Sequence, residues 1–251
     1  MNAAAPLLLV TGGSRGIGAA VALRAARDGF AVMVNYVAES DAAWRVVAAI
    51  TGQGGQAWSV RGDMGEEADV LRLFAAADAT GLRLAGLVNN AGITGGFARG
   101  SEVSAATLRR VLAVNVEGAI LASREAVRRM STRLGGQGGV IVNISSRAAQ
   151  LGGSGEWVHY GASKGAIDTL TVGMAREIAA EGVRVNAVSP GLIDTDIHAA
   201  AGEPGRVARM MATIPMGRAG TAEEVAEAVA WLLSPAASYI TGANLPVSGD
   251  R

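Results

Sequence analysis

The sequence predicts an α/β fold, a doubly wound parallel sheet of about seven strands with helices on both faces. Short runs rich in valine, isoleucine and leucine alternate with longer segments of helical period, a pattern typical of parallel sheets that are covered on both sides. A glycine-rich stretch separates the first apolar run from the first helical segment. The 251 residues contain no proline-rich linker, fixed repeat or charge run, so we expect a single domain over residues 1–251.

The strand predictions come from apolar runs of strand length that are bounded by glycine, asparagine or serine. They cover residues 7–10, 31–36, 57–60, 84–90, 139–146, 183–190 and 243–247. Helices of ordinary length are expected between them, the two longest around 104–133 and 157–181. Glycine clusters at 51–55 and 134–139 indicate helix ends that lead into the next strand.

Composition excludes several functional classes. Lysine plus arginine equals aspartate plus glutamate at 22 each, so no basic excess suggests nucleic acid or an anionic membrane as a partner. The chain has no cysteine and only two histidines, His159 and His198, for which we expect structural or solvent-facing roles and no metal site. No segment has the roughly 18 apolar residues that span a bilayer, and the apolar N-terminus lacks a basic leader. We therefore expect a cytoplasmic protein.

The glycine-rich stretch Thr11–Gly18 follows the first strand and opens an alanine-rich helix. Glycines permit a tight turn and let backbone N–H groups approach a pyrophosphate at the positive end of a helix. The glycines Gly12, Gly16 and Gly18 are spaced G-x-x-x-G-x-G, which differs from the usual G-x-G-x-x-G fingerprint. A dinucleotide-binding loop is favoured, and a plain strand-to-helix turn is the alternative.

The end of the second strand indicates which dinucleotide is bound. An NAD site places an acid there to bind the ribose 2′-hydroxyl, whereas this strand ends on Asn35 and Tyr36, with Glu39 as the first carboxylate. Arg15, inside the glycine loop, is placed to meet a 2′-phosphate. The pattern favours NADP(H), and NAD stays open because Glu39 would serve as the acid after a small shift in register.

The stretch YGASK carries Tyr160 and Lys164, which lie on one face of a helix at this spacing. Taken alone, the pair is more often an ordinary half-buried tyrosine and a solvated lysine than a catalytic pair. Other motifs decide between these interpretations.

Taken together and in order, these motifs resemble those of the short-chain dehydrogenase/reductase family, and the resemblance covers nearly the whole chain. TGGSRGIG matches the family's cofactor loop, NNAG (89–92) matches the end of its fourth strand, and SPG (189–191) with Thr195 matches the segment that holds the nicotinamide carboxamide. Asp63 matches the acid that contacts adenine. The resemblance implies a Rossmann-type fold and hydride exchange between a nicotinamide and a ketone or secondary alcohol, with Asn115, Ser146, Tyr160 and Lys164 as the catalytic tetrad.

In this interpretation Tyr160 exchanges the proton, Lys164 lowers the pKa of the tyrosine, and Asn115 helps to fix the lysine. Ser146 holds the substrate oxygen. It stands one residue further from the tyrosine than is usual in the family, so Ser145 competes for the role, but Ser145 is expected to face the opposite side of the strand.

The residues predicted to bind the cofactor come from six segments of the chain. They are Gly12, Ser14, Arg15, Gly16, Ile17, Gly18, Asn35, Tyr36, Asp63, Met64, Asn90, Ala91, Gly92, Tyr160, Lys164, Pro190, Gly191, Ile193 and Thr195.

Substrate identity is expected to lie in a lid at about 192–215, with a helix near 203–213. Met210 and Met211 are candidates for an apolar wall or for ordinary core packing. Arg206 is expected on a solvated helix face rather than at an anionic substrate. Arg147 is also expected to point toward solvent.

Three functions remain open. The first is NADP(H)-dependent reduction of a 3-oxoacyl-thioester-like carbonyl, as in 3-oxoacyl-[acyl-carrier-protein] reductases. The second is a sugar or polyol dehydrogenase of the glucose dehydrogenase type, and the third is a non-catalytic dinucleotide sensor. The resemblance also implies a homotetramer, with a dimer as the alternative.

Overall fold

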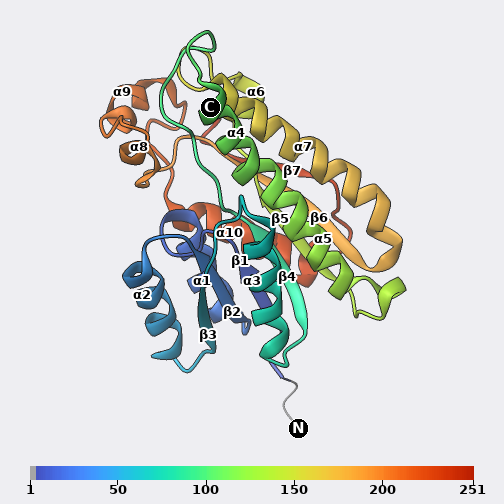
Figure 1. The fold of residues 1–251 in the computed structure, drawn as a ribbon. Coiled ribbons are helices and arrows are strands. Elements are labelled where there is room, and N and C mark those ends of the chain that lie inside the picture. The colour runs from blue at the N-terminus through green and yellow to red at the C-terminus, as the bar shows by residue number, and fades with distance from the viewer. Residues whose placement is uncertain (1–3) are drawn as a thin grey trace.

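The computed structural model describes residues 4–251, apart from the side chain of His198. Seven parallel strands form one sheet in the order β3-β2-β1-β4-β5-β6-β7 (Figure 1). The strands are β1 (Leu7–Val10), β2 (Ala31–Tyr36), β3 (Ala57–Arg61), β4 (Leu84–Asn89), β5 (Gly139–Ile144), β6 (Val183–Pro190) and β7 (Asn244–Val247). Every predicted strand is present with its ends within two residues, and the predicted fold class is confirmed.

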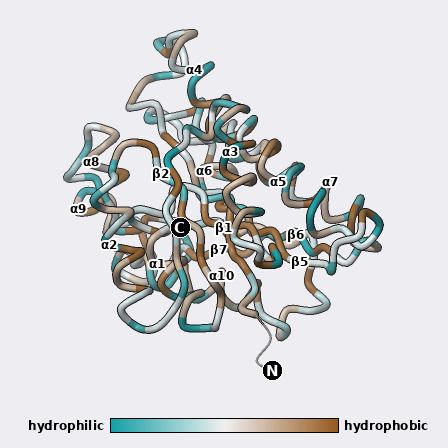
Figure 2. The backbone as a smooth tube through the Cα atoms, turned by 60° about the horizontal axis from the view of Figure 1, so that its bottom comes forward, coloured by the Kyte–Doolittle hydropathy of each residue, from teal (hydrophilic) through white to brown (hydrophobic). Residues whose placement is uncertain are grey.

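Helices cover both faces of the sheet (Figures 1 and 2). On one face lie α1 (Gly16–Arg27), α2 (Ser40–Thr51) and α10 (Ala222–Leu233), and on the other α3 (Glu67–Ala79), α5 (Gly118–Met130) and α7 (Val158–Ile178). In β1, Leu8 and Val10 pack toward the first set and Leu7 and Leu9 toward the second. All four are fully buried, which explains why this strand is an unbroken apolar run.

The strand order reverses beside β1, which pairs with β2 on one side and with β4 on the other. At such a reversal the loops that follow neighbouring strands diverge and leave a crevice at their carboxyl ends. The glycine-rich loop after β1 and the segment after β4 both begin at this point. The topology therefore places a ligand site there.

The helix expected over 104–133 is not continuous. It consists of α4 (Ala105–Leu112), a π-helical turn η1 (Ala113–Glu117), α5 and a short 3₁₀ turn η2 (Thr132–Leu134). The second long helix, α7, matches its prediction and ends in the 3₁₀ turn η3 (Ala179–Glu181). The helix expected near 203–213 is α9 (Arg206–Met210) followed by η4 (Met211–Thr213), and the remaining short helices are α6 (Ala148–Leu151), α8 (Ile197–Ala200) and η5 (Pro235–Ala237).

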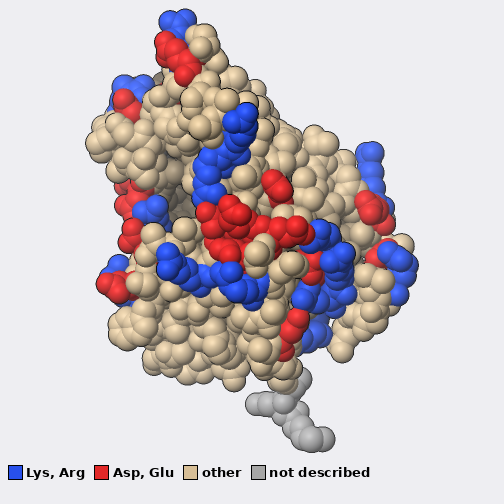
Figure 3. Space-filling model, in the orientation of Figure 1, with Lys and Arg blue, Asp and Glu red and all other residues tan. Residues whose placement is uncertain are grey.

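Basic and acidic side chains lie next to one another on the face shown in Figure 3. Ion pairs from α3, α4 and α5 account for this mixture, among them Arg124–Glu67 and Arg129–Asp78 at 2.8 and 2.7 Å. Exposed pairs of this kind contribute little to stability, about 1 kcal/mol or less each. Over the described residues, no helix is long and apolar enough to cross a membrane.

Candidate active site

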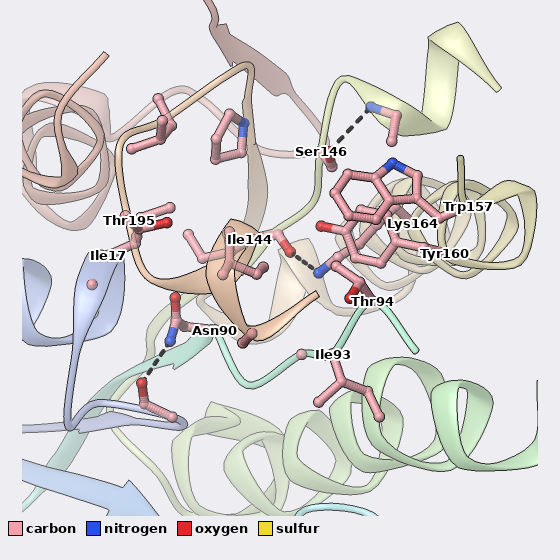
Figure 4. A pocket seen from close by; sticks show the side chains of 18 of the residues that line it. Ile17, Asn90, Ile93, Thr94, Ile144, Ser146, Trp157, Tyr160, Lys164 and Thr195 are labelled. Carbon is pink, nitrogen blue, oxygen red and sulfur yellow. Dashed lines mark hydrogen bonds between the residues drawn. The ribbon is translucent and has the colours of Figure 1, made fainter. Parts of the chain in front are cut away.

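A cavity of about 1180 Å³ opens at the carboxyl ends of β1, β4, β5 and β6. It extends from the glycine-rich loop to the start of α7, and Figure 4 shows Ile17, Asn90 and Thr195 on one side with Ser146, Tyr160 and Lys164 on the other. All the predicted site residues line this cavity except Gly18 and Asn115. The volume is large enough for a dinucleotide together with a small substrate.

The glycine-rich loop is shaped by contacts that only glycine permits. Gly12 and Gly16 have φ of 60° and 53°, values that residues with side chains rarely adopt. Gly18 lies below the loop, where a Cβ would stand 2.4 Å from the Gly12 carbonyl oxygen and 2.5 Å from the Asn90 amide nitrogen. Gly18 therefore lets α1 approach the loop closely, and it is not among the residues that line the cavity.

Asn35, expected to contact the cofactor, is buried and uses its amide within the protein. Its Oδ1 accepts a hydrogen bond from the Gly12 N–H at 3.2 Å, and its Nδ2 donates to the Gly62 carbonyl at 2.7 Å. The amide thus holds the loop in shape. Tyr36 and Arg15 line the same end of the cavity.

Asp63 lies in the cavity wall with a fixed carboxylate. Its Oδ1 accepts the Gly65 N–H at 2.8 Å, and its Oδ2 pairs with Arg110 of α4 at 2.6 Å. The sequence interpretation did not include Arg110, because nothing in its surroundings marks it out from other helical arginines. The pairing holds Asp63 in place beside Met64 in the cavity wall.

Asn115 occupies the π-helical turn and lies behind the cavity wall rather than in it. Its Oδ1 accepts the Ile93 N–H at 2.8 Å, and its Nδ2 donates to the Ile93 carbonyl at 2.9 Å and to Ser163 Oγ at 3.0 Å. The Ser163 hydroxyl in turn donates to the Tyr160 carbonyl at 2.7 Å. Asn115 therefore ties the segment after β4 to the helix that carries Tyr160 and Lys164, a use typical of π-turns at functional sites.

Tyr160 and Lys164 project into the cavity from one face of α7, as their spacing predicts (Figure 4). They are 8% and 4% exposed, and the ammonium lies 5.7 Å from the centre of the phenol ring. Lys164 Nζ donates to the Ile144 carbonyl at 2.7 Å. Burial lowers the pKa of Lys164 to about 8, while Asp168, one turn further along α7, opposes that change.

The expectation that Lys164 would lower the pKa of Tyr160 is wrong for the protein without ligands. Burial dominates and raises the pKa of Tyr160, while a hydrogen bond from Ser146 and the charge of Arg206 act in the opposite direction. Burial lowers the pKa of Lys164 to about 8, so the lysine has lost its proton in the pH range where the free phenol ionises; below about pH 8 it is charged and able to stabilise a phenolate.

The two candidate serines face different partners. Ser146 Oγ accepts the Ala148 N–H at 3.1 Å and interacts with Tyr160. Ser145 is buried, and its Oγ donates to Asp168 at 2.5 Å and to the Lys164 carbonyl at 3.3 Å. The alternation expected for consecutive strand residues thus leaves Ser146 beside the tyrosine.

Substitution of the two serines should separate their roles. We expect Ser146→Ala to lower kcat/KM by about 10²-fold, the loss typical of one hydrogen-bond donor at a developing oxyanion. The control Ser145→Ala should retain most of the activity and lose mainly stability, because its hydroxyl is bonded to Asp168. Steady-state kinetics and thermal unfolding measure both effects, and an inactive Ser145→Ala with an active Ser146→Ala would reverse the assignment.

Two arginines expected at the surface lie instead in the cavity wall. Arg206 is only 7% exposed, because α9 turns it inward onto Glu156 and Trp157. Arg147 donates from Nε to the Arg251 main-chain oxygen at 3.1 Å. Met210 also lines the cavity, whereas Met211 is 40% exposed.

His159 is buried behind this site, where its Nε2 bonds the Thr94 carbonyl at 2.8 Å. It does not line the cavity, and its hydrogen bond gives it a structural role. The side chain of His198 lies outside what the structure describes. Sequence reasoning missed Glu156, Trp157 and Asp250 in the cavity wall. Of these, only Trp157 could have been predicted to lie there, because it stands three residues before Tyr160 and so near the same face of the helix.

The fold and the cavity together define a class of protein, a nucleotide-binding α/β oxidoreductase in which a phosphate loop and a buried tyrosine–lysine pair share one cavity. Comparison with known proteins makes the class more specific. Residues 12–249 match a family model described as enoyl-(acyl carrier protein) reductase. The uncharacterized oxidoreductase YgfF of Escherichia coli is 51% identical over 245 residues, which cover 98% of this chain and 99% of YgfF.

Two further relatives carry more specific descriptions. Glucose 1-dehydrogenase 2 of Bacillus subtilis is 37% identical over 241 residues, covering 96% of this chain and 92% of that protein. A solved short-chain dehydrogenase from Burkholderia cenocepacia, in complex with NADP, superposes with a TM-score of 0.89 at 34% identity over 97% of this chain and 96% of that one. The chain belongs to the short-chain dehydrogenase/reductase family and is an oxidoreductase acting on alcohol and carbonyl groups. A non-catalytic sensor is thereby set aside.

Proposed function

We propose that the protein is an NADP(H)-dependent reductase of ketones that carry an apolar chain, with 3-oxoacyl-thioester-like compounds as the substrate class. The observation that carries this proposal is the lining of the cavity around Tyr160. Ala148, Leu151, Trp157, Ile197 and Met210 form an apolar and aromatic wall there. A hydrocarbon chain is stabilised by burial against such a wall, whereas a sugar would leave its hydroxyl groups without partners.

The residues of the cavity fit a dinucleotide. The glycine loop presents backbone N–H groups at the start of α1, which suits a pyrophosphate, and Asp63 suits a hydrogen bond to adenine. Thr195 and Ile193 suit the carboxamide end, and Lys164 suits the ribose beside it. When bound, the nicotinamide supplies the hydride that carbonyl reduction requires.

The protein's own groups supply the proton and the orientation. Ser146 holds the carbonyl oxygen against Tyr160, and Tyr160 donates its hydroxyl proton to the oxygen as negative charge develops there. Lys164 then stabilises the phenolate that remains. Because Tyr160 and Lys164 are buried, bulk water does not compete for the proton.

The preference for NADP(H) over NAD(H) is supported by the end of β2. Among the described residues that line the cavity there, Arg15 is a cation, and Tyr36 occupies a position where an acid would bind a 2′-hydroxyl. The NADP complex of the Burkholderia relative agrees with this preference. Glu39 also lines this end of the cavity and is the group through which NAD would be accepted.

A substrate screen tests the proposed function. With NADPH as the reductant we expect turnover of 3-oxoacyl thioesters and of medium-chain ketones, and at least tenfold lower kcat/KM with NADH, since a 2′-phosphate–arginine contact contributes about 1.5 to 3 kcal/mol. Oxidation of glucose and of polyols with NADP serves as the opposing arm. Equal use of NADH would contradict the cofactor preference, and efficient oxidation of glucose alone would contradict the substrate class.

We also propose that the segment 192–215 acts as a substrate lid and that the protein assembles as a homotetramer in the cytoplasm. Exposed apolar side chains on α4, α5 and α7 support the assembly, namely Leu108, Leu112, Ile120 and Val172. Burying them against copies of the chain would remove apolar surface from water. Sedimentation equilibrium distinguishes a tetramer from a dimer.

A further inference from the structure

Arg206 places a buried positive charge in the wall of the cavity. Two of its nitrogens, Nε and an Nη, donate to the same oxygen of Glu156 at 3.2 and 2.6 Å. Its Cζ lies 4.5 Å from the centre of the Trp157 ring. A guanidinium held by a carboxylate and an indole loses much of its freedom, so its charge has a fixed position.

These contacts join the segment 192–215 to the helix that bears Tyr160. Glu156 and Trp157 immediately precede α7, and the Trp157 ring lies 5.7 Å from the Tyr160 ring. The same indole therefore contacts both the arginine of α9 and the tyrosine. All four side chains line one cavity, where a low dielectric strengthens interactions between charges.

Several charged groups line the cavity or lie on the elements packed against Tyr160, and Asp250 is one of those in the lining. From α7 these are Lys164 and, one turn further, Asp168; from α9 it is Arg206 with its partner Glu156. From the segment after β5 it is Arg147, whose Nε is bonded to the main chain of Arg251. The side chain of Arg251 completes the group, as it lines the cavity and feels the charge of Arg206.

The net charge that α9 presents is positive. Glu156 is shared by Arg206 and Arg209, whose nearest nitrogens lie 2.6 and 3.5 Å from its two oxygens. Both arginines lower the pKa of Glu156, so the carboxylate stays ionised and retains its hold on Arg206. The arginine in turn lowers the pKa of Tyr160 against the effect of burial.

We propose that Arg206 is a positioning residue which keeps a positive charge at Tyr160 while α9 covers the cavity. The inference rests on the proposed function, in which Tyr160 exchanges the proton. It links the substrate-side segment to catalysis: the charge of Arg206 reaches Tyr160 while α9 keeps the guanidinium packed over Trp157. Displacement of α9 would remove this charge, and burial would then raise the pKa of Tyr160 further.

Two substitutions of opposite effect test the proposal. In Arg206→Gln we expect the midpoint for ionisation of Tyr160 to rise by about one pH unit, the size of one partly compensated charge at this depth. In Glu156→Gln we expect the midpoint to stay or to fall, because the negative charge is removed and the arginine remains over Trp157. Arg206→Lys should recover most of the wild-type midpoint, because it restores the charge.

The readout is the ultraviolet absorbance of the phenolate in the protein without ligands, measured as the difference from the matching Tyr160→Phe protein. The pH profile of alcohol oxidation gives a second measure, in which Arg206→Gln should be about tenfold slower below its midpoint. Arg209→Gln is the matched control, since this arginine is exposed and does not line the cavity.

A purely structural role would lower activity evenly at all pH values and leave both midpoints unchanged, which would overturn the proposal. A rise in KM confined to anionic substrates, again without a shifted midpoint, would instead make Arg206 a substrate-binding residue and also overturn it. The phenolate titration needs no substrate. A protein that reduces no ketone would therefore refute the proposed function while the titration still decides the role of Arg206.

Discussion

Turnover of the Tyr160→Phe variant is expected to fall by a factor of about 10² to 10⁴, the contribution typical of a positioned general acid. The hydroxyl of Tyr160 meets Ser146 within the cavity, and the ring is only 8% exposed. Removing the hydroxyl leaves the developing oxyanion without a donor on its reacting side. Water does not replace the donor readily, since Trp157 packs against the ring.

The fold should tolerate this substitution, because phenylalanine keeps the ring that contacts Trp157 and Lys164. We expect a loss of at most about 1 kcal/mol in the free energy of unfolding from the missing hydrogen bond. NADPH binding, followed by fluorescence of the reduced nicotinamide, should be close to that of the wild type. Activity within tenfold of the wild type would contradict the role of Tyr160 as proton donor.

The sheet was predictable because each strand has a simple pattern in the sequence. In a parallel sheet both faces of a strand are buried, so Leu7–Val10 and Val183–Pro190 appear in the sequence as unbroken apolar runs with clear ends. Tyr160 and Lys164 were predictable in the same way, since a four-residue spacing fixes their common face once the helix is known. The sequence pattern predicts the structure correctly where residues close together in the chain determine which side chains share a face.

Where contacts join distant segments, the sequence carried no such signal. The π-turn at Asn115 depends on a strand-end segment more than twenty residues earlier, through Ile93. The burial of Arg206 depends on Glu156, which is 50 residues away in the chain. An arginine on a short helix is usually solvated, and only the tertiary partner reverses that expectation.

Replacing Lys164 by methionine is expected to have the second largest effect, a fall in kcat of about 10²-fold. The ammonium is the buried cation nearest to the Tyr160 ring along α7, at 5.7 Å from its centre. Without it, the phenolate formed after proton transfer loses its charge partner. Methionine fills a similar volume, so α7 and the neighbouring β5 should keep their packing.

The same variant reveals how burial of the lysine affects stability. Burial lowers the pKa of Lys164 from 10.5 to about 8 in the folded protein. Between these two values the unfolded chain binds more protons, so the stability of the wild type rises with pH through this window. The total gain is about 3 kcal/mol for a difference of this size.

The measurement is the free energy of unfolding of the wild type minus that of Lys164→Met, from denaturant titrations between about pH 7 and 10. We expect this difference to grow by about 2 to 3 kcal/mol across the range. The raised pKa of Tyr160 acts with the opposite sign above about pH 10, because the unfolded phenol then releases its proton first. Since both proteins contain Tyr160, its contribution largely cancels in the difference. A flat difference would mean that Lys164 remains charged throughout, in which case Asp168 and the phenol, rather than burial, would determine its protonation.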